Sequence, residues 1–175
     1  AIDLLVLLTD ESLKERHAAA LESFITFLWD TRLAIGHSVR TLGECRDVAA
    51  GDITIATALM EARTVGGDPG LLARLAALTG PEQIWPSAEF FRAKWDEQKA
   101  RHRKFNNTEY NLEPNIKGCP GGLRDVQTVG WVAKRHFHAT STLELVARGF
   151  LTAHEYEALA NGQDFPWRVR YALHM

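Results

Sequence analysis

The sequence predicts a mainly α-helical fold with a small β-sheet (α+β), and three observations lead to this prediction. The run Ile2–Leu8 is continuously apolar except for Asp3, which is typical of a buried β-strand. A second extended stretch follows at residues 34–40. From residue 52 onward, apolar residues recur at helical spacing between Gly, Pro and Asp breakpoints, so about two strands are followed by a bundle of helices.

The composition limits the classes of protein to which the chain can belong. Its 175 residues are 46% hydrophobic, which suffices for a packed core. The net charge of −2 argues against a nucleic-acid-binding protein, which carries a basic excess. Cys45 and Cys119 are too far apart for a metal motif and suit a reduced, cytoplasmic compartment. No apolar run has the length of a membrane span, so we expect no membrane partner.

The first strand contains one carboxylate that needs an explanation. A run such as Ile2–Leu8 is expected to be buried on both faces. Asp3 either faces water at the end of the strand or binds Mg²⁺, which is held by one or two carboxylates plus substrate phosphates. Ser12 is the expected cap of a helix over residues 13–31. The apolar stripe of this helix comprises Leu13, His17, Leu21, Phe24 and Leu28.

The second strand, residues 34–40, carries two candidate polar side chains. His37 is either structural or catalytic. Arg40 suits contact with phosphate, because a guanidinium group matches phosphate oxygens, although a surface salt bridge is the alternative.

Three further helices follow, separated by clear breakpoints. Asp52 is the expected N-cap of a helix that ends near Arg63. Gly66-Gly67-Asp68-Pro69 ends this region, and Asp-Pro is typical of an N-cap and first helical residue. We therefore place a domain boundary between residues 1–67 and 68–175. A short helix spans residues 71–78, and a long one spans residues 87–105.

The long helix combines aromatic residues with a basic end. Phe90, Phe91 and Trp95 are expected to lie in the core, and a ligand platform is the alternative. The basic run Lys99–Lys104 suits a helix C-terminus and could also help to hold a triphosphate or an acidic partner surface.

The loop Asn111–Asp125 is the least ordinary stretch of the chain. Pro114 disfavours helix before it, and Pro120-Gly121-Gly122 cannot continue one. We expect a turn that leads into a helix over residues 125–138, with Asp125 as its N-cap and free N–H groups that suit an anion. The alternative is a loop whose charged side chains pair with each other.

The C-terminal part is predicted to contain two helices. Thr152 and Glu155 form a capping box for a short helix that ends near Ala160. Arg168 and Arg170 are expected to lie on the solvated side of the last helix. Its apolar stripe comprises Phe165, Val169, Ala172 and Leu173.

The loop also carries a family resemblance. The order Tyr-Asn-Leu-Glu-Pro-Asn-Ile-Lys at residues 110–117, followed by Pro-Gly-Gly-Leu-Arg-Asp at residues 120–125, closely resembles the bacterial bifunctional PII uridylyltransferase/uridylyl-removing enzymes. The resemblance extends from residues 2–5 through residues 36–41 to residues 167–170. It implies that the chain is a fragment: the rear of a polymerase-beta-type nucleotidyltransferase domain, followed by a helical domain.

The resemblance also implies roles for named residues. Asp3 matches the second carboxylate of the family's Asp-x-Asp pair, so it is the expected catalytic and metal-binding residue. Ala1 stands where the first carboxylate is expected, and the Gly-rich turn would lie upstream. The loop would pack against the nucleotidyltransferase domain and help to complete its cleft. We expect Arg40, Lys117 and Arg124 to contact nucleotide phosphates. We expect Glu113, Asn115 and Asp125 to position the loop.

By resemblance, the intact enzyme transfers UMP from UTP to a tyrosine of the PII nitrogen-signalling protein with Mg²⁺, and the fragment alone is expected to be inactive. One alternative is a non-catalytic helical module that docks PII or a neighbouring domain. Another is a nucleotidyltransferase like the glutamine synthetase adenylyltransferases. The histidines show no His-Asp pair of the kind found in the family's hydrolase domain, so no uridylyl-removing activity is expected of this chain.

Overall fold

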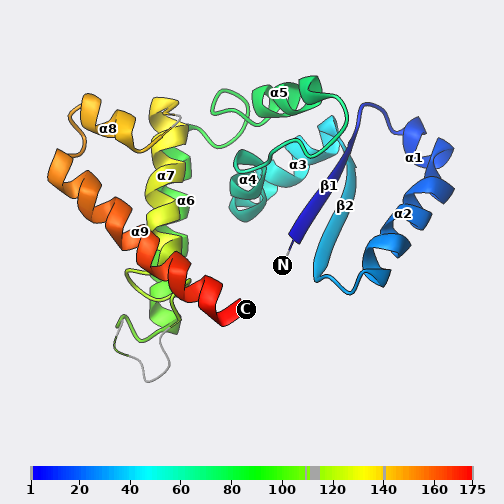
Figure 1. Cartoon of the computed structure of the whole chain (residues 1–175). Coiled ribbons are helices and arrows are strands. Elements are labelled where there is room, and N and C mark those ends of the chain that lie inside the picture. Colours follow the sequence, from blue (N-terminus) through cyan, green and yellow to red (C-terminus); the bar gives the residue numbers. More distant parts are fainter. Residues whose placement is uncertain (1, 109, 111–114, 140, 175) are drawn as a thin grey trace. The chain divides into compact units, whose positions relative to one another are not determined.

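The computed structural model of the chain describes residues 2–108, 110, 115–139 and 141–174. Within these residues there are two strands and nine helices, which confirms the predicted mainly α-helical fold with a small sheet (Figure 1). Contacts divide the chain into two compact units, Ala1–Ile84 (unit 1) and Trp85–Met175 (unit 2), and each is described by itself. No described helix combines the length and hydropathy needed to cross a membrane.

The sheet of unit 1 consists of two parallel strands. Strand β1 (Ile2–Leu8) pairs with β2 (Ile35–Thr41), and Ile2 lies opposite Ile35. Both strands were predicted, β2 within one residue. The expectation that β1 is buried on both faces is wrong, because Ile2 is 52% exposed, Asp3 is exposed and the rest of the strand is half-buried. In the part of the chain that the structure describes, β1 has one neighbouring strand, so less of its surface is covered.

The predicted helix over residues 13–31 is two helices, α1 (Ser12–Arg16) and α2 (Ala18–Asp30). His17 separates them because its backbone leaves the helical region, with φ −109° and ψ 12°. Ser12 is not the N-cap. It lies inside α1, and its N–H donates to Asp10 Oδ1 at 2.8 Å.

Three helices follow the sheet: α3 (Leu42–Gly51), α4 (Ile53–Met60) and α5 (Pro69–Leu78). The N-caps Asp52 and Asp68 are confirmed, since their carboxylates accept from the N–H groups of Thr54 and Gly70 at 2.7 and 2.8 Å. Helix α4 ends at Met60, before the predicted Arg63.

Helix α3 was not predicted, although its start carries a sequence signal. Thr41 Oγ1 accepts from the Glu44 N–H at 3.2 Å, and the Glu44 carboxylate accepts from the Thr41 N–H at 2.7 Å. This reciprocal pair is a capping box, which can be recognised from the spacing Thr-x-x-Glu.

Helices cover both faces of the sheet (Figure 1). Leu5 and Leu7 of β1 pack against the buried core of Leu42, Cys45 and Leu75, which come from α3 and α5. Helix α2 packs against β2 instead. In Figure 1, α3 and α4 lie on one side of the strands, with α1 and α2 on the other.

Helix α5 belongs to unit 1 by its packing. Its residue Leu75, 1% exposed, shares the core of Leu42 and Cys45. The break in contacts therefore follows Ile84 rather than residue 67. The assignment of residues 1–67 and 68–175 to two functional domains stays a prediction.

Unit 2 contains α6 (Ser87–Lys104), α7 (Leu123–Phe137), α8 (Leu143–Ala147) and α9 (Ala153–His174). Helices α6 and α7 pack against each other, and α9 packs on α7 and α8. The capping box before α9 is confirmed, because the Thr152 N–H donates to Glu155 Oε2 at 2.8 Å. The two predicted C-terminal helices are a single helix that continues through Pro166. Helix α8 was not predicted.

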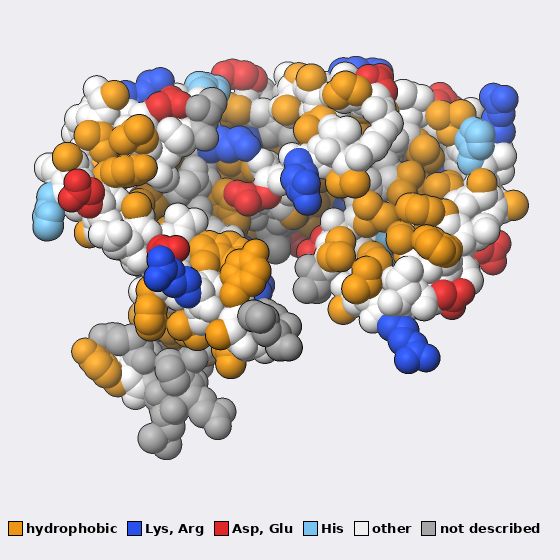
Figure 2. Space-filling model, viewed as in Figure 1, with side chains coloured by type: hydrophobic (Ala, Val, Ile, Leu, Met, Phe, Trp, Pro, Cys, Tyr) orange, Lys and Arg blue, Asp and Glu red, His pale blue; other side chains and the backbone are white. Residues whose placement is uncertain are grey.

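Several aromatic residues expected in the core are exposed. Phe90 is fully buried, but Phe91 and Trp95 are 51% and 49% exposed, because they lie on the side of α6 away from Phe90. Phe165 and Leu173 of α9 are 68% and 74% exposed, so the predicted stripe of the last helix is not a buried one. In unit 1, hydrophobic side chains also gather at the surface around α2, seen as orange atoms at the right of Figure 2.

Candidate functional site

The predicted catalytic carboxylate lies at an exposed position on the sheet. Asp3 is exposed near the start of β1, opposite Gly36 of β2. A Cβ atom on Gly36 would lie 2.9 Å from Asp3 Oδ1. The missing side chain of Gly36 therefore leaves the space into which the Asp3 carboxylate extends.

The donor set around Asp3 suits a partial metal site. Mg²⁺ binds one or two protein carboxylates together with substrate phosphates and water. No group of three or more His, Cys, Asp or Glu side chains converges among the described residues. An accessible carboxylate such as Asp3 fits one oxygen ligand of a site that substrate completes, and its metal-binding role stays a prediction.

Arg40 shares the face of the sheet on which Asp3 lies. Side chains alternate along a strand, and Arg40 is paired with Leu7, four positions along from the pair of Asp3 and Gly36. This offset separates the two residues by about 13 Å along the strand. Arg40 is half-buried and makes no ion pair with any residue that the structure describes. Its contact with phosphate stays a prediction.

His37 lies on the opposite face of β2 from Arg40. Its ring contacts Trp29 of α2 edge-on, with centroids 5.4 Å apart. This packing favours the structural alternative for His37.

In unit 2, one carboxylate of α7 gathers polar groups from two other segments, α6 and the loop before α7. The Asp125 carboxylate accepts from Gln98 Nε2 at 2.8 Å, from Arg101 NH2 at 2.5 Å and from the Gly121 N–H at 2.8 Å. His102 Nε2 lies 3.1 and 3.0 Å from its two oxygens. Asp125 and Arg101 are only 17% and 15% exposed, so this cluster, which we call the Asp125 hub, is largely shielded from water.

Burial alone raises the pKa of Asp125, because a charged carboxylate is poorly solvated in the protein interior. The hydrogen bonds from Arg101, Gln98 and Gly121 outweigh burial, so the pKa of Asp125 is below its usual value. The carboxylate is therefore ionised at neutral pH, and Arg101 balances its charge.

The sequence suggested that Asp125 is the N-cap of α7, and this prediction is wrong. Gly122 occupies that position and Asp125 is the third residue of the helix, from which its carboxylate reaches back to the Gly121 N–H. The loop is thus held by the side chain of a helical residue.

The expected anion site at the start of α7 is closed. The N–H groups of Leu123 and Arg124 donate to the carbonyls of Ile116 and Lys117 at 3.0 and 2.9 Å. The Asp125 N–H donates to the Gly122 carbonyl at 2.9 Å. The N–H groups that would face an anion are therefore already hydrogen-bonded to the loop.

Glycine is needed where the loop meets the helix. A Cβ atom on Gly122 would lie 2.9 Å from the carbonyl oxygens of both Cys119 and Ile116. Gly121 has φ +74°, a conformation that favours glycine. The Gly-Gly step therefore serves close backbone packing and a left-handed turn.

The other predicted loop residues have different surroundings. Lys117 is exposed. Asn115 Oδ1 accepts from the N–H groups of Lys117 and Gly118 at 3.1 and 2.8 Å, a turn that supports its predicted positioning role. Arg124 Cζ lies 5.1 Å from the ring centroid of Trp131. Glu113 lies outside the described residues.

Sequence reasoning missed the role of two residues in the basic run. Arg101 and His102 bind Asp125, and Arg101 NH1 also donates to the Gly118 carbonyl at 2.8 Å. The spacing of Gln98, Arg101 and His102 on one side of α6 was visible in the sequence. The carboxylate that they share was not, because Asp125 lies 23 positions beyond His102.

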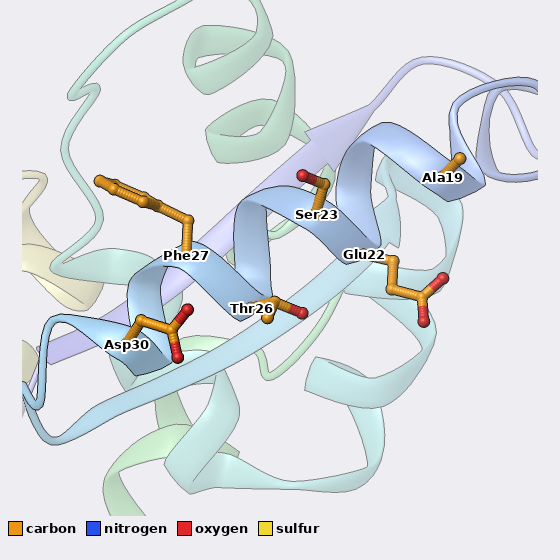
Figure 3. A pocket seen from close by; sticks show the side chains of 6 residues that line it. All are labelled: Ala19, Glu22, Ser23, Thr26, Phe27 and Asp30. Carbon is orange, nitrogen blue, oxygen red and sulfur yellow. The ribbon is translucent and has the colours of Figure 1, made fainter.

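An apolar groove of about 300 Å³ adjoins the hub in unit 2. Gln98 and Asp125 form its polar end, and the exposed rings of Phe91 and Trp95 form part of its wall. A second hollow in unit 1 is lined only by α2 residues, from Ala19 to Asp30, as Figure 3 shows. Because only one helix forms that hollow, it provides no converging groups for chemistry.

Comparisons with known proteins match nearly the whole chain. The family model described as GlnD PII-uridylyltransferase matches residues 89–175. The chain is 53% identical over 174 residues to a bifunctional uridylyltransferase/uridylyl-removing enzyme of Ectopseudomonas mendocina (strain ymp), and 51% identical to those of Stutzerimonas stutzeri (strain A1501) and Azotobacter vinelandii. Each match covers 99% of this chain and 19% of the relative, so the chain spans about a fifth of its relatives' length. No solved structure matches.

Proposed function

Because this chain belongs to the PII-uridylyltransferase family, we propose that it forms part of an enzyme that transfers UMP from UTP to a tyrosine of the PII nitrogen-signalling protein. The observation that carries the proposal is the 53% identity to a uridylyltransferase over 99% of the chain. In this proposal the chain works in the cytoplasm, together with the other domains of a longer enzyme.

The accessible carboxylate of Asp3 supports a role in this reaction. Phosphoryl and nucleotidyl transfer depend on positioning and on neutralising phosphate charge. Asp3 would supply one oxygen ligand to Mg²⁺, which neutralises phosphate charge when bound. Arg40, on the same face of the sheet, would contribute a guanidinium group to the phosphates. The tyrosine hydroxyl of PII would attack the α-phosphorus of UTP, and pyrophosphate would leave.

The test is a UMP-transfer assay with a full-length chimera, in which this chain replaces the matching 174 residues of the Ectopseudomonas mendocina relative. We expect transfer from UTP to PII, and a loss on the order of 10³-fold with Asp3→Ala, because a metal ligand stabilises several kcal/mol of transition-state charge. Asp30→Ala is the matched control. It removes another exposed carboxylate of unit 1, at the end of α2, and we expect it to leave transfer unchanged.

The other outcomes separate the remaining hypotheses. Binding of PII by a folded chimera without any transfer would contradict the proposal and favour a non-catalytic docking module. Transfer from ATP in preference to UTP would favour an adenylyltransferase. Full transfer by Asp3→Ala would show that Asp3 does not belong to the catalytic site.

A further inference from the structure

We propose that Gln98, Arg101 and His102 of α6 are positioning residues, which hold the loop of residues 115–122 through Asp125 so that Lys117 is presented to the phosphates of the nucleotide. This inference rests on the proposed function for the identity of the ligand. The hydrogen bonds that hold the loop do not depend on it.

The contacts of Arg101 show how the loop is held. Its guanidinium group donates to Asp125 Oδ1 through NH2 at 2.5 Å and to the Gly118 carbonyl through NH1 at 2.8 Å. One side chain of α6 thus binds both the loop and the first turn of α7. Asp125 in turn binds the Gly121 N–H at 2.8 Å, so the loop is fixed at two points.

The burial and charge of the hub argue against direct phosphate binding by Arg101. Its side chain is 15% exposed, and its charge is balanced by a carboxylate that is 17% exposed. A phosphate that replaced Asp125 on Arg101 would leave a shielded carboxylate without its cation, which is costly.

Lys117 is an exposed cation of the loop that the hub holds through Gly118 and Gly121. Its side chain is exposed, while its backbone is fixed on both sides. The Lys117 N–H donates to Asn115 Oδ1 at 3.1 Å, and its carbonyl accepts from the Arg124 N–H at 2.9 Å. A fixed backbone with an exposed ammonium group suits a phosphate contact, because less loop entropy is lost on binding.

The first test measures hydrogen exchange in the 175-residue chain. We expect Arg101→Ala to speed exchange of the Gly118, Cys119, Gly121 and Gly122 amides about tenfold or more, because charge-assisted hydrogen bonds hold the loop. Arg101→Lys should not restore protection, since a single ammonium group does not reproduce the two-pronged guanidinium contact. Arg92→Ala is the matched control: it removes an exposed arginine from the same helix and should leave the loop unchanged. Unchanged loop exchange in Arg101→Ala would overturn the inference whether or not the enzyme is active.

The second test is a double-mutant cycle on UMP transfer in the full-length chimera. We expect Lys117→Ala and Arg101→Ala each to raise KM for UTP about tenfold, and the double variant to be no worse than Lys117→Ala alone. Additive effects would show that Arg101 contacts the substrate itself, and would overturn the positioning role. A lower melting temperature with an unchanged KM would show that the hub only stabilises the fold, which would also overturn the positioning role. Absence of transfer in the unsubstituted chimera would refute the proposed function instead, and the exchange experiment would then decide the positioning role.

Discussion

Replacing Gly122 by alanine should loosen the start of α7, and the size of the effect follows from the geometry. The new Cβ atom would lie 2.9 Å from two carbonyl oxygens and 3.1 Å from a third, so it is at least about 0.5 Å too close to a fixed backbone. Overpacking of this kind costs about 1–3 kcal/mol. Relaxation would also weaken the hydrogen bonds from Leu123 and Arg124 to the loop, at about 1 kcal/mol each.

One term opposes this cost. Gly122 has φ −77° and ψ 177°, which alanine adopts freely. Because alanine lowers the conformational entropy of the unfolded chain, this effect would stabilise the folded state by about 0.4–1 kcal/mol. The net destabilisation is about 2–4 kcal/mol. The assay is native-state hydrogen exchange of the α7 amides, which should become about 30- to 1,000-fold faster if these amides exchange through opening of unit 2.

Gly130→Ala provides the matched control, because Gly130 lies in the same helix and its added Cβ atom would meet nothing within 4 Å. It should slow exchange, since alanine favours helix by about 1 kcal/mol over glycine. Unchanged exchange in Gly122→Ala would refute the close packing of loop and helix. Equal acceleration in both variants would show that the contact is not the cause.

Three further outcomes are expected. Thr41→Ala should destabilise unit 1 by about 1 kcal/mol in urea unfolding, because it removes half of the capping box with Glu44, whereas Thr41→Ser should retain stability. The lowered pKa of Asp125 means that its ionised form stabilises the fold at neutral pH and that this stability is lost as pH falls below about 4. The melting-temperature difference between wild type and Asp125→Asn should therefore shrink from pH 7 to about pH 3; a constant difference would contradict the shift. Burial raises the pKa of the fully buried Cys45 thiol, so in a Cys119→Ser variant it should react with a thiol reagent on the order of 10³-fold faster in urea than in buffer.

Local signals in the sequence predicted much of the fold. The apolar run Ile2–Leu8 located β1, and the extended stretch at residues 34–40 located β2. Asp52, Asp68 and the Thr152 capping box marked the starts of three helices. These features act over a few residues, so they can be read from the chain itself. The family could also be identified from the loop and its flanking motifs, and the comparisons confirm it.

Other expectations failed where local signals conflict with packing. Two helices were expected in the C-terminal part, the first ending near Ala160, yet α9 is a single helix that continues through Pro166. Phe91 and Trp95 have core-type side chains but lie at the surface beside the groove, because Phe90 takes the buried side of α6. Local propensity is a weak guide at such positions, since the partners that decide burial are distant in sequence.

The sequence by itself determined the family, the small sheet, and the Gly-Gly turn of the loop before α7. Only the tertiary structure decided what the loop does with its polar groups. The N–H groups at the start of α7 donate to carbonyls of the loop, and Asp125 binds Gln98, Arg101 and His102. The physical reason is that hydrogen bonds in a shielded site depend on which segments pack together, and residues more than 20 positions apart meet only once α6 and α7 are packed.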